Sequence, residues 1–239
     1  MERIDHHSGG YAYLAGGTFA SGGVIALAGM GIRHVVLDRP VPLLPGLDLV
    51  RRELDHAGRP LVALCGLELR LPAAMTEPRF EEFNGRYLEH LGRWGLLRDG
   101  SPPLARTNVA PSTAPPEVAS LLAFSYTAPT LSDTDDMVIT GVADVGPDGA
   151  AIQPGDMVES ASFVAKEVSA RITALGSRWA HGDRTHLYCA RPAVFEIARS
   201  VLGPQSYGLV WHDSVPPVLG LELEIDVRRH HREQTLEIT

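Results

Sequence analysis

Short apolar runs separated by glycines open the chain. Residues 11–38, YAYLAGGTFASGGVIALAGMGIRHVVLD, show this pattern, which is typical of two or three strands joined by tight turns. Residues 45–58 then place Leu47, Val50 and Leu54 on one face at helical spacing, and Gly58 follows as a stop signal. The pattern predicts a small sheet followed by an amphipathic helix.

The rest of the first half continues with a strand, a second amphipathic helix and two more strands. These elements are expected at residues 59–71, 77–97, 104–110 and 118–128. The polar, acidic segment 129–136 follows and is typical of a linker. We therefore divide the chain into a domain at 1–129 and a domain at 130–239.

The second half repeats the order of the first. A hairpin, a helix, a strand, a helix and two strands are expected at residues 137–152, 153–176, 184–190, 192–203, 206–213 and 218–229. Pro154 lies near the start of the first of these helices and Gly176 at its end. The recurrence indicates an internal duplication.

The last predicted strand alternates apolar and acidic positions. Its apolar side consists of Leu221, Leu223, Ile225 and Val227, and its acidic side of Glu222, Glu224 and Asp226. Each half then forms an α+β layer, a sheet with two helices on one face. The other sheet face needs a cover too, so the halves, or several chains, should associate.

Composition excludes several classes of function. With 239 residues, 44% of them hydrophobic, the chain can bury one large core or two modest ones. Its net charge is −8 and Lys166 is its only lysine, which argues against a nucleic-acid partner. The N-terminus lacks the order of a signal peptide, and no apolar run is long enough to cross a membrane. We expect a soluble cytoplasmic protein.

The cysteines and histidines show no metal-binding spacing. Cys65 and Cys189 stand far apart and are expected to be free and buried. The pairs His6–His7 and His230–His231 lie near the termini, without HExxH or CxxC. We therefore expect no metal.

Arg106 interrupts a predicted strand between two proline-bounded segments. A buried arginine is costly unless something pairs with it. Either an acid of the chain or a ligand must supply that partner.

The order of short motifs resembles the Rid, or YjgF-type, family of imine and enamine deaminases. The motifs are FASGG, PGLD, FEEFNGRY and LARTNVAP in the first half, and VITGVADVGPDG, PGDM and VPPVLGLELEI in the second. The texts RTNVAP and FSYTAP resemble in particular the 2-aminomuconate deaminases, and the two-domain chorismatases are more distant relatives. The resemblance implies tandem Rid-like, chorismate-mutase-like domains, each a mostly antiparallel sheet with two helices, in a trimer-like barrel with pockets between domains.

The same resemblance implies an activity and a set of site residues. The expected reaction is hydrolytic deamination of a small enamine or imine carboxylic acid, without a cofactor, by a homo-oligomer such as a trimer. Arg106, with its neighbours Thr107 and Asn108, is expected to bind the carboxylate, and Glu222 to be the catalytic acid.

Each half keeps only one member of the arginine and acid pair. In the first half the place of the acid falls near Leu121, and in the second half the place of the arginine falls near Tyr207, close to Trp211. We count both Tyr207 and Trp211 as candidate substrate-binding residues. A chorismatase-like hydrolase and a non-catalytic carboxylate-binding protein remain the alternatives.

Overall fold

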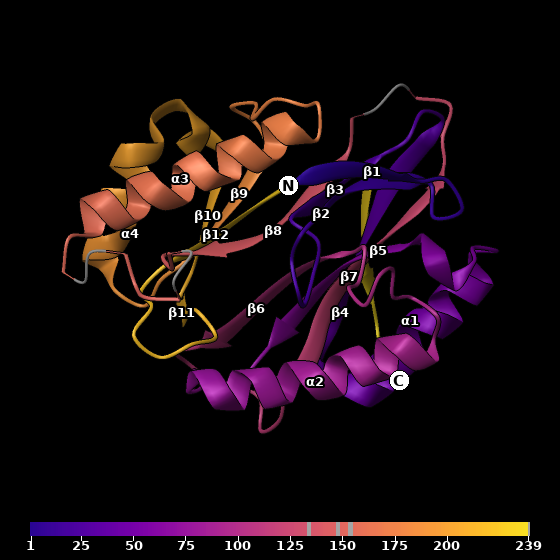
Figure 1. Ribbon diagram of the computed structural model, residues 1–239, viewed down its shortest axis with the longest axis horizontal. Coiled ribbons are helices and arrows are strands. Elements are labelled where there is room, and N and C mark those ends of the chain that lie inside the picture. Colours follow the sequence, from indigo (N-terminus) through magenta and orange to yellow (C-terminus); the bar gives the residue numbers. More distant parts are fainter. Residues whose placement is uncertain (133–134, 147–148, 153–154, 239) are drawn as a thin grey trace.

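The computed structural model describes residues 1–132, 135–146, 149–152 and 155–238. They form two packed sheets with helices on the outer faces (Figure 1). The helices are α1 (Leu43–His56), α2 (Glu77–Arg93), α3 (Met157–Ala174) and α4 (Pro192–Leu202). The mixed α+β class predicted from the sequence is confirmed.

The first sheet contains strands from both ends of the chain. In spatial order its strands are β1 (Glu2–His6), β2 (Tyr11–Ala15), β3 (Gly23–Ala26), β8 (Met137–Ala143), β12 (Glu224–Arg229), β9 (Arg184–Tyr188) and β10 (Leu209–His212). Helices α3 and α4 cover its outer face (Figure 1).

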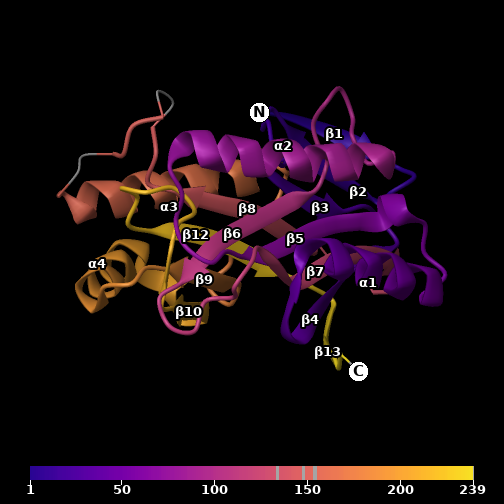
Figure 2. The same cartoon turned by 90° about the horizontal axis from the view of Figure 1, so that it is seen from below.

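The second sheet belongs mostly to the first half of the chain. Its order is β11 (Ser214–Val215), β6 (Ala105–Pro111), β5 (Leu64–Arg70), β7 (Ser120–Pro129), β4 (Met30–Pro42) and β13 (Arg232–Leu236). Seen from below, α1 and α2 lie across this sheet (Figure 2).

The order of elements recurs in the two halves. The succession β4–α1–β5–α2–β6–β7 has the sheet order β4-β7-β5-β6, and β8–α3–β9–α4–β10–β12 has the order β8-β12-β9-β10. The division at residues 129 and 130 stays a prediction.

The two halves exchange strands across that division. Strands β1 to β3 join the sheet of the second half, while β11 and β13 join the sheet of the first. Both sheets are open, so the described residues form no closed barrel.

Apolar residues bury each sheet against its own helices. One core lies between α3, α4 and the first sheet, and includes Val164, Val168 and Ile225. Another lies between α1, α2 and the second sheet, where it includes Leu47 and Phe124. These cores form because each helix carries apolar residues on a single face.

The inner sheet faces carry charge as well as apolar groups. Arg228 on β12 pairs with Glu68 on β5, and its Nη2 lies 2.6 Å from Asp226 Oδ2. His34 Nε2 lies 3.2 Å from Glu68 Oε1. A buried charge is tolerated when it is paired and hydrogen-bonded, as here.

Two further expectations can be compared with the structure. Cys65 and Cys189 are free and buried, as predicted. Among the described residues, no helix is both long and apolar enough to cross a membrane.

The start of α3 can be compared with the sequence-based expectation only in part. Pro154, expected near that start, lies outside the described residues. Asp156 caps the helix, because its side chain accepts from the backbone N of Val158 at 3.1 Å.

Candidate active site

Arg106 is held on β6 with its side chain against helix α2. Its guanidinium carbon lies 4.5 Å from the centroid of the Tyr87 ring, and the residue is 7% exposed. Asn108 is two residues further along, on the same face of the strand. With its amide oriented to satisfy both neighbours, its oxygen accepts from Arg106 Nε at 3.1 Å and from Nη2 at 3.0 Å. Arg106 Nη1 is buried and has no hydrogen-bond partner among the described residues.

Glu224 is the first residue of β12 and approaches the same region from the other sheet. It is 4% exposed, and no cation of the described residues lies within ion-pair distance of its carboxylate. Burial raises the pKa of Glu224, and the nearby Asp226 raises it further. Arg106, Arg70 and Arg171 act in the opposite direction, and the pKa reaches about 8. At pH 7 Glu224 is therefore mostly a neutral acid that holds a proton.

Two adjoining cavities open beside these residues. The smaller, of about 220 Å³, is lined by Arg106, Asn108 and Glu224 among others. The larger, of about 390 Å³, extends along β8 and α3 over mostly apolar side chains. Both cavities are lined by Phe80, Gly141, Arg171, Pro217 and Glu224. They form one cleft with a guanidinium at one end and an acid near its middle.

A bulge in β8 shapes the wall of this cleft. Thr140 and Gly141 together oppose the single residue Asp226 on β12. The bulge turns the Thr140 hydroxyl toward β6, where it accepts from the backbone N of Arg106 at 3.2 Å. Bulges of this kind often re-aim side chains next to active sites.

Gly141 lets the Glu224 carboxylate lie directly against the backbone. A Cβ at residue 141 would overlap that carboxylate and come within 2.7 Å of Glu224 Cδ. Only glycine leaves this space.

We expect Gly141→Ala to lower kcat about 10²-fold, because a displacement of about 1 Å at a reacting group has effects of that size. Steady-state turnover of the two variants and the wild type measures the loss. Gly85→Ala is the matched control, because a Cβ at this exposed α2 position meets nothing within 4 Å. Equal activity of the two variants would contradict the placement of Glu224.

Asp226 lies beside Glu224 and stays charged. It accepts from Thr107 Oγ1 at 2.8 Å and from the Tyr188 hydroxyl at 3.0 Å. Burial alone would raise the pKa of Asp226, but the adjacent Arg228 outweighs burial and holds that pKa below its ordinary value. The two neighbouring carboxyl groups therefore have different pKa values: Glu224 can act as an acid, while Asp226 remains an anion.

Comparisons with known proteins identify the family. Residues 3–234 match the model of the family described as 2-aminomuconate deaminase CnbZ. The chain belongs to this family. A 2-amino-5-chloromuconate deaminase of Comamonas testosteroni is 36% identical over 244 residues, which cover 95% of this chain and 96% of that protein. Membership of the 2-aminomuconate deaminase family confirms the resemblance stated from the sequence, and confirms that the protein is an enzyme of the deaminase class.

Solved structures add a likeness in fold. A chorismatase is 11% identical, with a TM-score of 0.52, and the match covers 87% of this chain and 77% of that one. A Mycobacterium tuberculosis member of the YjgF/YER057c/UK114 family matches 40% of this chain and 78% of its own, with 15% identity and a TM-score of 0.29. At its level of identity the chorismatase match shows the fold alone.

Of the three consecutive residues predicted to bind substrate, two line the cleft and one does not. Arg106 and Asn108 line the smaller cavity. Thr107 points to the opposite face of β6, where its hydroxyl donates to Asp226 between the sheets. Its place in the structure is thus beside the charged inner layer.

Glu222, expected as the catalytic acid, does not face Arg106. The strand begins only at Glu224, so Glu222 lies in the irregular segment before it. Its backbone N donates to Asp144 Oδ1 at 3.1 Å, and its side chain pairs with Arg191. Glu224, two residues further along, is the acid that lines the cleft.

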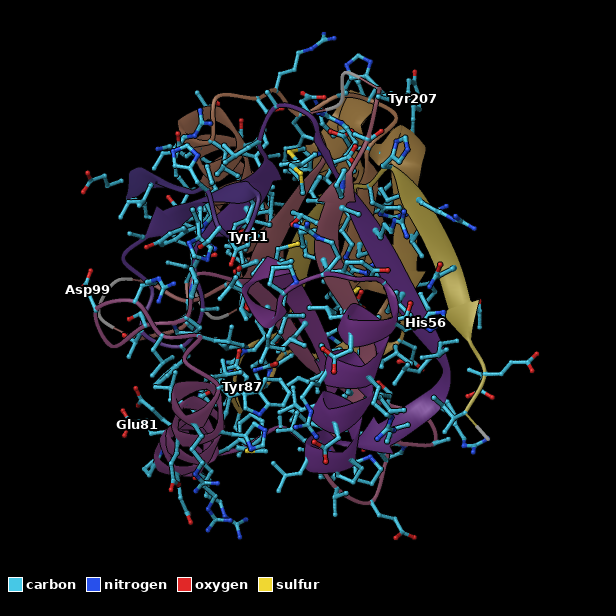
Figure 3. The ribbon with its side chains drawn as sticks, turned by 90° about the vertical axis from the view of Figure 1, so that its right-hand side faces the viewer. Tyr11, His56, Glu81, Tyr87, Asp99 and Tyr207 are labelled. Carbon is cyan, nitrogen blue, oxygen red and sulfur yellow. The ribbon has the colours of Figure 1, made fainter. Side chains whose placement is uncertain are left out.

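Tyr207 and Trp211 also lie away from the cleft. Tyr207 is 81% exposed, and Figure 3 shows it near the top of the view, whereas Tyr87, over which Arg106 lies, is below the middle. Trp211 stacks on Phe195 at 5.0 Å between ring centroids and donates from Nε1 to the Cys189 carbonyl at 2.8 Å. Neither residue lines either cavity of the cleft.

Sequence reasoning missed Arg171 and Gly141 as site residues. Arg171 comes from a helix, at a position where an arginine is unremarkable, and Gly141 stands in the sequence only as part of the motif VITGVADVGPDG. That Gly141 lies against Glu224 follows only from the register between β8 and β12, which the sequence does not give. Within the described residues, no group of three or more His, Cys, Asp or Glu side chains is placed to hold a metal ion.

Proposed function

We propose that the protein hydrolyses a 2-aminomuconate-type enamine acid to the corresponding 2-oxo acid and ammonia. Family membership supports the reaction class. The observation that carries the proposal for this chain is the buried Arg106 guanidinium, which lies over the Tyr87 ring, forms no ion pair among the described residues and shares a cleft with the protonated Glu224. A guanidinium matches a carboxylate bidentately and fixes its orientation.

Glu224 is suited to the first proton transfer. An enamine becomes reactive toward water when its β-carbon accepts a proton, which converts the carbon–nitrogen bond to an iminium. Glu224 holds a proton at pH 7 because burial and Asp226 raise its pKa to about 8. It can donate this proton and leave a carboxylate within the cleft.

The same carboxylate completes the hydrolysis. It accepts a proton from water as the oxygen adds to the iminium carbon, which gives a carbinolamine. It then returns that proton to the nitrogen. Ammonia leaves as the carbon–nitrogen bond breaks, the carbonyl forms and the hydroxyl proton passes to the Glu224 carboxylate, which is protonated again as at the start. One water is consumed, one ammonia is released, and no electrons are exchanged.

The expected test result is ammonia release from an enzymatically generated 2-aminomuconate that depends on pH. Because the resting enzyme must hold the Glu224 proton, kcat/KM should be level below the pKa of about 8 and fall about tenfold per pH unit above it. A rate no faster than in buffer would reject the function. A rate that instead rises through pH 8 would reject the acid role of Glu224.

Asp226→Asn provides the internal control for this profile. Removing the neighbouring negative charge lowers the pKa of Glu224, so the alkaline limb should move to lower pH. Ionisation of the substrate itself affects both pH profiles equally, because both enzymes are assayed with the same substrate. Pyruvate release from chorismate, measured in parallel, tests the chorismatase alternative.

A further inference from the structure

A second guanidinium lies in the cleft. Arg171 projects from helix α3 and lines both cavities, as Glu224 does. Its only hydrogen bond among the described residues is a long one of 3.5 Å, from Nη1 to the Thr140 carbonyl, and its Nε is buried without a partner. Arg171 is therefore held near the acid with donors to spare.

The charges around the cleft do not balance. Arg106 and Arg171 are cations, whereas Glu224 is mostly neutral at pH 7. Glu167, one helical turn before Arg171, lines the larger cavity, but it forms no ion pair within 4.0 Å among the described residues. Asp226 is already paired with Arg228. Glu167 acts on Arg171 from beyond ion-pair distance, so Arg171, which is partly buried, is only partly compensated. A positive charge out of water is costly unless a partner compensates it, and a ligand carboxylate would supply that partner.

The cleft between the two guanidiniums is suited to a short, flat carbon chain. Phe80 and Pro217 line both cavities, so an apolar wall runs past Glu224 from one cavity to the next. Arg106, Glu224 and Arg171 all line the smaller cavity, and Glu224 and Arg171 also line the larger one. A ligand with one carboxylate at Arg106 therefore shares its cavity with both Glu224 and Arg171.

We propose that Arg171 is a specificity-determining residue that pairs with the distal carboxylate of the substrate, so that the cleft selects dicarboxylates over monocarboxylates of the same length. This inference rests on the proposed function, which defines the end of the ligand that reacts. The pairing itself is a binding property and can be measured without turnover.

The test compares two six-carbon dienes that differ by one carboxylate, trans,trans-muconate and sorbate. Isothermal titration of the wild type is expected to give a Kd for muconate about tenfold or more below that for sorbate, because the second carboxylate gains a charge-assisted fork. In Arg171→Gln the ratio of the two Kd values should fall to about one or two. Lys166→Gln is the matched control, since it removes an exposed cation from the same helix, and its ratio should equal that of the wild type.

Arg171→Lys keeps the result informative if the glutamine variant does not fold. Lysine retains the charge without the planar fork, so the ratio should fall between those of the wild type and the glutamine variant. Equal Kd values for muconate and sorbate in the wild type would overturn the proposal. So would a folded Arg171→Gln that weakens both ligands by the same factor, because that result indicates a structural role.

The proposed function can fail separately. If no enamine acid releases ammonia but muconate still binds preferentially through Arg171, the site is a dicarboxylate site with a different activity. If ammonia is released equally fast from monocarboxylate and dicarboxylate enamines, the function stands and the role of Arg171 is rejected.

Discussion

Glu224→Gln is expected to lower kcat for deamination by about 10²–10⁴, the range that general acid–base groups contribute. Glutamine has nearly the same shape as the protonated acid that the cleft stabilises, where the pKa of Glu224 is about 8. It can therefore still contact the substrate but cannot transfer a proton. KM should change little while kcat falls, which single-turnover and steady-state ammonia release can separate.

Glu222→Gln is the control for this prediction. Glu222 lies two residues away and pairs with Arg191 at a partly exposed position. Its substitution should leave kcat within about twofold, since exposed ion pairs contribute little. If Glu222→Gln loses activity and Glu224→Gln keeps it, Glu222 is the catalytic acid, as the sequence predicts, and the assignment to Glu224 is wrong.

The comparison of Glu222 with Glu224 shows what the sequence could predict. The alternation along 221–227 correctly separated the apolar residues from the acidic ones, and Ile225 and Val227 do pack in the core under α3 and α4. The alternation of apolar and acidic residues does not predict at which residue the strand begins to pair with its neighbours. The structure starts β12 at Glu224, and that boundary decides which acid reaches the cleft.

The order of helices and strands along the chain could be predicted from local patterns, whereas the sheet that each strand joins could not. Local patterns located the four helices and most strands, because each element buries one face against its neighbours. The exchange of β1–β3 and β13 between the halves is a long-range choice that no local window records. The cleft depends on that assembly, since Arg106 comes from one sheet and Glu224 from the other.

Arg106→Gln is expected to lower kcat/KM by about 10²–10³, chiefly through KM, because it removes one partner of a buried charge-assisted pair with the substrate. Arg106→Lys should recover little of this loss, since a lysine ammonium cannot reproduce the planar fork that Asn108 orients. Initial rates over a range of enamine concentrations, together with the rise in Tm caused by muconate, measure the two effects.

The free energy of unfolding of Arg106→Gln distinguishes a ligand-binding arginine from a structural one. Arg106 is hydrogen-bonded to Asn108 and lies over the Tyr87 ring, but its Nη1 has no partner among the described residues, so Arg106→Gln should lower the free energy of unfolding of the ligand-free protein by no more than about 1–2 kcal/mol. Arg228 gives the contrast, because it is buried between Glu68 and Asp226. Arg228→Gln should lower the free energy of unfolding by about 3–5 kcal/mol, as expected when a buried pair is broken. If urea unfolding shows a loss of that size for Arg106→Gln, the arginine is part of the internal ion-pair framework, and the carboxylate of the substrate must be bound elsewhere.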